Sequence, residues 1–551
     1  MRRSGIKVMG ELIGLVRPLA HIMVFAVVTG VLGYLTAIFI TVFGGLAIAE
    51  ILGFPGPLSL RTLLSAVIFL AVARGLLRYA EQLSNHYIAF KILALIRNKV
   101  FTALRRLAPA KLEGRDKGNL ISIITSDIEL LEVFYAHTIS PIAIAFLTSL
   151  IMVAFIAGYS PLLAFLALAA YLTVGVLVPV GVSKLGSDVG LAYRNGFGDL
   201  NSFVLDSLRG LKEIIQYGMG QKRLLQLNAR TDELSRKHRE LKKYEGLAKA
   251  ITDTVILFFS AAMLFTGLLL YTRGAVGFDG VLIPTIAMMS SFGPVVALSS
   301  LSNNLRHTLA SGNRVLDLLE EEPVVEEVED GKILDFGTVE CSNIDFAYGA
   351  EPILEDYSLQ IRENNIVGIH GRSGSGKSTL LKLLMRFWDV DNGRVAIAGE
   401  DIRNVNTSSL RNLQGYLTQE THLFNDTIAE NIRIAKPDAT LEEIIEAAKK
   451  AAVHDFIVSL PNGYETNVGE LGESLSSGER QRIGLARVFL HDAPFVLLDE
   501  PTSNLDSLNE GMILKSLLEE SENKTMVLVS HRKSTMNIAD LVIEMESGRA
   551  S

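Results

Sequence analysis

The chain has 551 residues, enough for more than one domain. Hydrophobic residues make up 49% of it, and the mean hydropathy of +0.32 is high for a soluble protein. A formal net charge of −8 argues against nucleic-acid binding as the main role, because such proteins usually present a basic face. Apolar residues concentrate between positions 19 and 303. This uneven distribution predicts a membrane part followed by a soluble part.

The N-terminal region begins with basic residues and continues into an apolar run from Leu19 to Ala49. That run is longer than the core of a cleaved signal peptide, so we expect a retained helix. A bilayer-spanning helix needs roughly 20 apolar residues. Six segments satisfy this requirement: 19–49, 60–83, 138–158, 161–183, 248–271 and 279–303.

The connections between these segments alternate in length and charge. Those at 84–137 and 184–247 are long and rich in Lys and Arg, whereas the others are short. Basic loops tend to stay in the cytoplasm. We therefore expect a multi-pass protein of the plasma membrane, with both termini and the soluble part in the cytoplasm. The predicted organisation is a membrane domain over 1–310, an acidic linker over 311–335 and a soluble domain over 336–551.

The two long loops carry apolar residues at helical spacing, which predicts helices that continue past the bilayer. Each loop is interrupted by glycines, Gly114 and Gly118 in the first and Gly210 and Gly218 in the second. We expect turns there that flank short helices able to touch the soluble domain. The alternative is that these segments are solvated connectors.

The second spanning segment carries Arg74, Arg78 and His86, which fall within about a third of the helix circumference. Charges at membrane depth usually face a cavity or a partner. A cationic cavity would suit an anionic cargo. Alternatively, the arginines pair with acids or extend to the membrane surface, and His86 is a polar residue near the membrane edge.

The soluble domain contains a phosphate loop between an apolar strand and an apolar helix. Its glycines and the helix N-terminus suit backbone N–H contacts with phosphates. The residues predicted to bind nucleotide here are Gly371, Ser373, Gly374, Ser375, Gly376, Lys377, Ser378 and Thr379. Lys377 is expected to bridge the β and γ phosphates, and Ser378 to hold Mg²⁺.

A second apolar run ends in Asp499 and Glu500. An uninterrupted apolar run fits a buried parallel strand, and ligands of α/β folds bind at the carboxyl ends of such strands. Asp499 is expected to hold Mg²⁺ and Glu500 to position the attacking water. The alternative is a pair of acids that only caps a strand. The single cysteine, Cys341, precludes an intrachain disulfide and is expected to be a small buried apolar residue.

With these motifs in order, the whole chain resembles the ABC transporters of exporter architecture. The residues that carry the resemblance are Tyr348 in Phe-Ala-Tyr, Gln419 in Leu-Thr-Gln-Glu, Ser476 and Gly478 in Leu-Ser-Ser-Gly-Glu, Asp506 in Ser-Asn-Leu-Asp, and His531 in Val-Ser-His-Arg.

The resemblance implies six transmembrane helices followed by an α/β P-loop ATPase cassette that uses ATP and Mg²⁺. It also implies that Tyr348 stacks on adenine, that Gln419 contacts Mg²⁺ and that His531 acts beside Glu500. In this family each nucleotide lies between the phosphate loop of one cassette and the signature of another, here Ser476 and Gly478. A second ABC half-transporter chain is therefore an expected partner.

Two departures concern that signature, which has Ser477 where the family usually has glycine and Glu479 where it commonly has glutamine. Unequal ATP sites in a heterodimer are therefore expected, with a homodimer as the alternative.

The segment from Arg78 to His86 resembles the second helix of the CydC subunit family, although Gln82 and Lys91 stand where that pattern has arginine. It implies export of a thiol such as glutathione or cysteine, or of haem. The alternatives are a homodimeric lipid or drug exporter, and an ABC-derived channel or regulator.

Overall fold

A computed structural model describes residues 3–54, 58–349, 351–472, 474–503 and 505–545; within these, the side chains of 6, 117, 182–188, 299–307 and 471 are not described. The chain divides into two compact units. Unit 1 comprises Met1–Ala103 and Arg115–Glu321, and unit 2 comprises Leu104–Gly114 and Glu322–Ser551. The end of the second long helix thus groups with the soluble domain.

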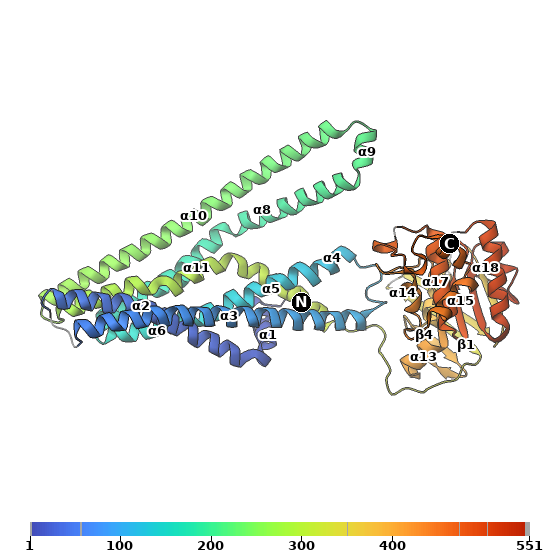
Figure 1. The fold of residues 1–551 in the computed structure, drawn as a ribbon, viewed down its shortest axis with the longest axis horizontal. Helices are drawn as coiled ribbons and strands as arrows, with labels where there is room; N and C mark the ends of the chain where they lie inside the picture. Colours follow the sequence, from blue (N-terminus) through green and yellow to red (C-terminus); the bar gives the residue numbers. More distant parts are fainter. Residues whose placement is uncertain (1–2, 55–57, 350, 473, 504, 546–551) are drawn as a thin grey trace. The chain divides into compact units, whose positions relative to one another are not determined.

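Unit 1 is built from helices (Figure 1). In chain order these are α1 (Gly5–Leu15), η1 (Arg17–Leu19), α2 (Ala20–Ile51), α3 (Leu60–Leu107), α4 (Lys117–Ser122), η2 (Ile123–Asp127), α5 (Ile128–Phe134), η3 (Tyr135–Ile139), α6 (Ser140–Ala157), α7 (Pro161–Leu172), η4 (Thr173–Leu177), α8 (Val178–Arg209), α9 (Leu211–Gln216), α10 (Gly220–Thr272) and α11 (Phe278–Glu320). Six helical stretches in the described part of the chain are long and apolar enough to cross a membrane, as predicted.

The apolar faces of the spanning helices meet in a core cluster that includes Ile38, Met152, Met263 and Met288, all at most 1% exposed. Many other large apolar side chains, such as Phe69 and Phe165, are 69% or more exposed, as lipid-facing residues would be. The spanning helices therefore carry apolar residues both on the faces that pack against other helices and on the faces that do not pack against protein.

The long loops are helical extensions, as the periodicity predicts. In the second loop, α9 lies between Gly210 and Gly218, and Gly218 has a φ of +63° at its turn. In the first loop, the turn includes Gly114, with a φ of +78°, but Gly118 is part of α4. The predicted turn at Gly114 therefore precedes a short helix, α4, whereas Gly118 lies inside that helix, where its N–H donates to the capping residue Asp116.

The linker also begins later than predicted, because α11 continues to Glu320. Residues 311–320 are helical since Val315 and Leu316 are buried there. In addition, Asp127 accepts hydrogen bonds from Ser311 Oγ, at 2.9 Å, and from Arg314. Extended chain replaces the helix from Glu321 onward.

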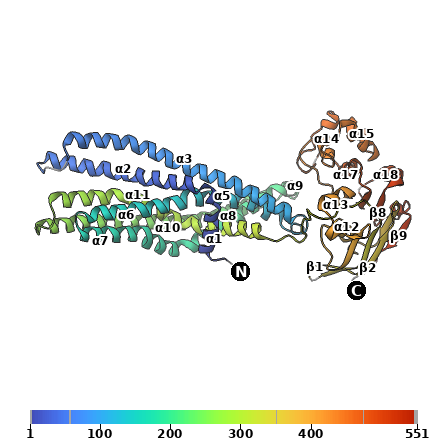
Figure 2. The ribbon, with the colours of Figure 1, turned by 90° about the horizontal axis from the view of Figure 1, so that it is seen from below.

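The described residues of unit 2 form two sheets (Figure 2). The antiparallel sheet has the order β2-β1-β4-β5, and the parallel sheet has the order β6-β7-β8-β3-β9. The strands are β1 (Val339–Tyr348), β2 (Glu351–Ile361), β3 (Ile366–His370), β4 (Asn392–Ile397), β5 (Glu400–Asp401), β6 (Gln414–Leu417), β7 (Phe495–Asp499), β8 (Thr525–Ser530) and β9 (Leu541–Glu544).

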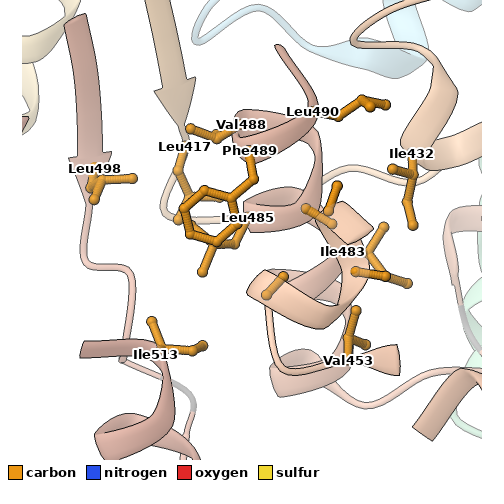
Figure 3. Packing of buried hydrophobic residues seen from close by; sticks show 14 of the residues in the cluster. Leu417, Ile432, Val453, Ile483, Leu485, Val488, Phe489, Leu490, Leu498 and Ile513 are labelled. Atoms are coloured by element: carbon orange, nitrogen blue, oxygen red, sulfur yellow. The ribbon is translucent and has the colours of Figure 1, made fainter. Parts of the chain in front are cut away.

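Helices cover the parallel sheet, whose inner strands β3, β7 and β8 are buried almost throughout. The helices are α12 (Lys377–Leu384), α13 (Thr407–Leu413), α14 (Ile428–Arg433), α15 (Leu441–Lys450), α16 (His454–Ser459), α17 (Ser477–His491), α18 (Ser507–Glu520) and α19 (Lys533–Met536). Figure 3 shows Leu485 and Phe489 of α17 packed with Leu417 of β6. This packing fixes α17 against the sheet.

The turn that follows α3 belongs to the same unit as the soluble domain. Glu113 of this turn forms an ion pair with Lys382, which lies on α12. Residues 105–110 also line a cavity of about 340 Å³ together with Arg386, Phe387 and Arg411. The first long loop therefore contacts the soluble domain through the last residues of α3 and the turn that follows them.

Candidate nucleotide site

Four predicted motifs follow four neighbouring strands of the parallel sheet. In the order β6, β7, β8 and β3, the strands are followed by Gln419, by Asp499 and Glu500, by His531 and by the phosphate loop. Parallel strands place their carboxyl ends at one edge, where ligands of α/β folds bind. Motifs separated by up to 160 residues therefore meet along one edge.

The phosphate loop connects β3 to α12 and favours glycine at Gly371, Gly376 and also Gly374, whose φ is +83°. Gly376 precedes α12 with a φ of +97°, a left-handed conformation that favours glycine. A Cβ at Gly371 would lie 2.3 Å from the carbonyl oxygen of Met545. Ser373 and Gly374 are exposed, whereas Ser375, Gly376 and Thr379 are buried or nearly so.

Lys377 begins α12 and is only 6% exposed. Its Nζ donates hydrogen bonds to the carbonyl oxygens of Gly371, at 3.0 Å, and Arg372, at 2.6 Å. Burial lowers the pKa of this ammonium, and the nearby carboxylates of Glu500 and Asp499 oppose that shift. A cation and two acids thus share the end of the sheet.

Asp499 is the last residue of β7 and is 3% exposed. Burial raises the pKa of its carboxyl group, while a hydrogen bond with Ser378 lowers it. Its Oδ1 is buried and has no hydrogen-bond partner among the described residues. A buried carboxylate oxygen without a partner is uncommon, and it suits a cation.

Glu500 leaves the strand with a φ of +52°, which is unusual for a residue with a side chain. Two main-chain bonds hold it there: its N–H donates to Val529 O at 2.9 Å, and its carbonyl accepts Gln481 Nε2 at 2.6 Å. Its Oε1 lies 2.9 Å from Nδ1 of His531. The backbone therefore aims the carboxylate at the histidine that follows the next strand.

The signature residues lie at the start of α17. Ser476 caps this helix by accepting the N–H of Glu479 at 3.3 Å, and Glu479 Oε2 accepts the N–H of Ser476 at 2.8 Å. This reciprocal pair is a capping box, which a Glu at this position forms as readily as a Gln. Glu479, one of the two departures, therefore keeps the helix start intact and adds a negative charge to it. Gly478 lies in the first turn.

The remaining predicted residues lie at separate places. Tyr348 ends β1, and its ring packs edge-on against Trp388 at 5.2 Å between centroids. Asp506 caps α18, and hydrogen bonds from Asn509 lower the pKa of its carboxyl group. Gln419 is exposed. Asn504, which belongs to the same motif as Asp506, lies outside the described residues.

The three charged or titratable residues predicted on the second spanning helix also differ in their surroundings. Arg74 is exposed, whereas Arg78 donates a hydrogen bond to Glu81 at 2.7 Å and lines a cavity. The ring of His86 packs edge-on against that of His137 at 5.8 Å. The sequence left two alternatives for Arg78, a place in a cavity or a pairing with an acid, and the structure shows both. The sequence did not indicate the roles of Gln481, which bonds the main chain of Glu500, or of His137, which lines the cavity. For Glu81, the available signal was its position three residues after Arg78 on the same helix.

A phosphate loop, an acidic strand end and six candidate spans define a membrane protein with a P-loop ATPase. Models of the "ABC transporter" and the "ABC transporter transmembrane region" match residues 354–503 and 20–295. The chain belongs to the ABC transporter family. It is 55% identical over 552 residues to a Haemophilus influenzae protein called "Probable ABC transporter ATP-binding/permease protein", with 100% of both chains covered.

Two further proteins are similar to this chain over most of its length. A "Fatty acid ABC transporter ATP-binding/permease protein" of Mycobacterium bovis is 31% identical over 491 residues, covering 88% of this chain and 77% of the relative. The structure of a bacterial Atm1-family ABC exporter with ATP bound matches 97% of this chain and 94% of that one, with a TM-score of 0.82 and 24% identity.

The predicted fold, an exporter-type membrane domain followed by an ATPase cassette, is therefore confirmed. The chain is a multi-pass membrane protein that binds ATP and couples its hydrolysis to transport. Half-transporter chains of this kind work as dimers in a membrane.

Proposed function

We propose that the chain is one half of a heterodimeric exporter of the plasma membrane that moves a small cargo bearing negative charge. A thiol such as glutathione or cysteine, or haem, fits this description. The observation that carries the proposal is the position of Arg78, a cation that lines a cavity among the spanning helices. The basic long loops support a cytoplasmic position for the cassette and both termini.

In the ATP site, Lys377 binds the β and γ phosphates, and N–H groups of the glycine-rich loop bind the remaining phosphate oxygens. Tyr348 stacks on the adenine. Glu500 accepts a hydrogen bond from the attacking water, and His531 holds the Glu500 carboxylate in position. The signature of the partner chain completes this ATP site. In turn, the signature of this chain completes the partner's ATP site through Ser476 and Gly478, with Asp506 nearby.

Mg²⁺ fits the same site, because the unpartnered Oδ1 of Asp499 lies on a carboxylate that also bonds Ser378. Ser378, Asp499 and Gln419 are the residues that would hold it. When bound, the ion neutralises charge on the phosphates. Substituting Asp499 by Asn is expected to raise the Mg²⁺ concentration needed for half-maximal turnover.

The sequence of the signature supports the heterodimer. Glu479 places a negative charge in the first turn of α17, where the partner's phosphates would bind, and like charges repel. The stronger ATP site would then combine this chain's phosphate loop with the partner's signature. Co-purification tests this: two kinds of chain in equal amounts are expected. A stable, fully active homodimer with two equal sites would contradict the proposal.

The second candidate is a homodimeric exporter of lipids, and the fatty-acid relative favours it. Cargo-stimulated ATPase activity separates the two. We expect stimulation by glutathione or haem, blunted for both by Arg78→Ala and mainly for haem by His86→Ala, because imidazole is a common axial ligand. Arg74→Ala is the matched control for an exposed arginine on the same helix. Stimulation by long-chain fatty acids or lipids, with none by glutathione or haem, would favour the second candidate.

A further inference from the structure

A cavity of about 390 Å³ lies within unit 1, at the small end of the size range of ligand pockets. Four parts of the helical bundle contribute to it: α2, α3, the stretch from α5 through η3 to α6, and α11 (Figure 1). Among the described residues its lining includes Tyr34, Arg78, Glu81, Asn85, His137 and Ile144.

One wall of the cavity is polar and buried. Glu81 and Asn85, four residues apart on α3, share a helix face and are 4% and 3% exposed. Glu81 accepts a hydrogen bond from Arg78, which satisfies part of its carboxylate. Asn85 Oδ1 is buried and has no hydrogen-bond partner within the described part of the chain. Native structures rarely retain such an acceptor, so it points to a donor that a ligand supplies.

The other walls are mainly apolar. Ile144 of α6 and Val133 of α5 face the cavity, and Tyr34 lies 5.9 Å from the guanidinium of Arg78. The wall from α5 to α6 includes η3, a π-helical turn that contributes Ala136 and His137. Turns of this kind occur often at functional sites.

The charges in this cavity do not match a simple anion. Glu81 cancels the charge of Arg78, and its carboxylate lies beside a second acceptor, Asn85. An anion would bind the remaining N–H donors of Arg78 but would leave Asn85 unpaired and would meet the carboxylate. The side chain of Arg78 is 52% exposed, so N–H donors that do not bond Glu81 can reach a ligand. A ligand that carries only a positive charge would offer these donors no acidic group.

We propose that this cavity binds a small zwitterion, with its ammonium held by Glu81 and Asn85 and its acidic group by Arg78. The proposal rests on the proposed exporter function and narrows the cargo from an anion to a molecule with both charges. Two sources share this chemistry: a free amino acid or short peptide, and the head group of an ethanolamine phospholipid.

The test measures ATPase stimulation of the purified full chain, with any co-purifying partner, in nanodiscs of phosphatidylglycerol. Glutathione and N-acetylglutathione are the soluble probes, since the second lacks the ammonium group. A separate arm replaces part of the lipid by phosphatidylethanolamine. We expect stimulation by glutathione if the source is a peptide, or by phosphatidylethanolamine if it is a lipid, and weak stimulation by N-acetylglutathione.

Asn85→Leu removes the unpaired acceptor at similar size. It is expected to raise the half-maximal concentration of the active probe at least about tenfold, as for loss of a hydrogen bond to a charged group. Ser84→Ala is the control, because Ser84 is also buried on α3 but donates to Ala80 O within the helix. Should Asn85→Leu not fold, Glu81→Gln carries the same expectation, because it removes the charge that holds the ammonium.

Equal stimulation by glutathione and N-acetylglutathione would overturn the proposal, as would an unchanged half-maximal concentration in both α3 variants. Failure of every probe would overturn it too. Basal ATP turnover separates these failures from failure of the exporter assignment. If Lys377→Ala abolishes that turnover and the control Ser84→Ala preserves it, the exporter function stands.

Discussion

Replacing Glu500 by glutamine removes one negative charge from the carboxyl end of β7 and keeps the size of the side chain. The bonds that fix residue 500 use its main chain, the N–H to Val529 and the carbonyl from Gln481, so the substitution leaves them in place. The contact it weakens is the one with His531, which is 56% exposed. We therefore expect a stability loss of less than about 1 kcal/mol.

Turnover should respond far more strongly than stability. A positioned base typically accelerates a reaction about 10²–10⁴-fold, equivalent to about 3–5 kcal/mol of the barrier. Nucleotide binding should persist, because Lys377 and the phosphate loop are unchanged. Glu500→Gln is thus expected to hold ATP without hydrolysing it.

Phosphate release and retention of labelled ATP measure these two quantities on the same purified dimer. The ATP site built on the partner's phosphate loop is inactivated in both the wild-type and the variant samples. The measured phosphate release and bound ATP then come from the site that contains this chain's phosphate loop. Thermal denaturation of the variant checks that its fold is kept. Turnover within twofold of wild type, with ATP bound, would refute the role assigned to Glu500.

Lys377→Ala is expected to weaken ATP binding about 10–100-fold, because it removes hydrogen bonds from a charged donor, and equilibrium binding measures this. Phe489→Ala should destabilise the cassette by about 3–5 kcal/mol, seen as a lower thermal midpoint of the full chain, whereas an unchanged midpoint would contradict the packing of α17. Burial raises the pKa of the Cys341 thiol to about 12. The native thiol stays neutral while an unfolded one ionises near pH 8.5, so this residue's contribution to stability is complete below that pH and falls as the pH rises toward 12. Maleimide should accordingly label Cys341 only after unfolding, and rapid labelling of the native protein at pH 8 would contradict its burial. Glu113→Gln is expected to reduce transport severalfold while basal ATP turnover remains, and parallel loss of both would point to a merely structural contact.

Much of the architecture was predictable because its signals are local. Uninterrupted apolar runs identify the six spans, and periodic apolar residues such as Ile96 and Val100 predict the helical extensions. The end of α11 was not predictable from composition. Its acidic character suggested a linker, but tertiary contacts of Arg314 with Asp127, far away in the sequence, keep it helical.

The nucleotide-binding residues were predictable for a different reason. Phosphate chemistry demands glycines, a lysine and acids at fixed places, so each motif is recognisable alone. Their convergence depends on strand order, which the sequence does not state. The cavity was harder still, because Asn85 is an ordinary polar residue in the sequence. Only burial and the lack of a hydrogen-bond partner distinguish it.

One helix of the cassette connects two of the features described above. Lys377 and Lys382 are on α12, which is roughly 12 Å long. Its first residue belongs to the phosphate loop, and Lys382 forms the ion pair with Glu113 in the turn after α3. A short helix moves as a rigid rod, so a tilt caused by phosphates would reach the turn after α3 through this pair of side chains, in addition to the contacts of residues 105–110. Both side chains are partly exposed to water, at 24% and 44%. Salt screens such pairs, and transport should therefore lose efficiency at high ionic strength before ATP hydrolysis does.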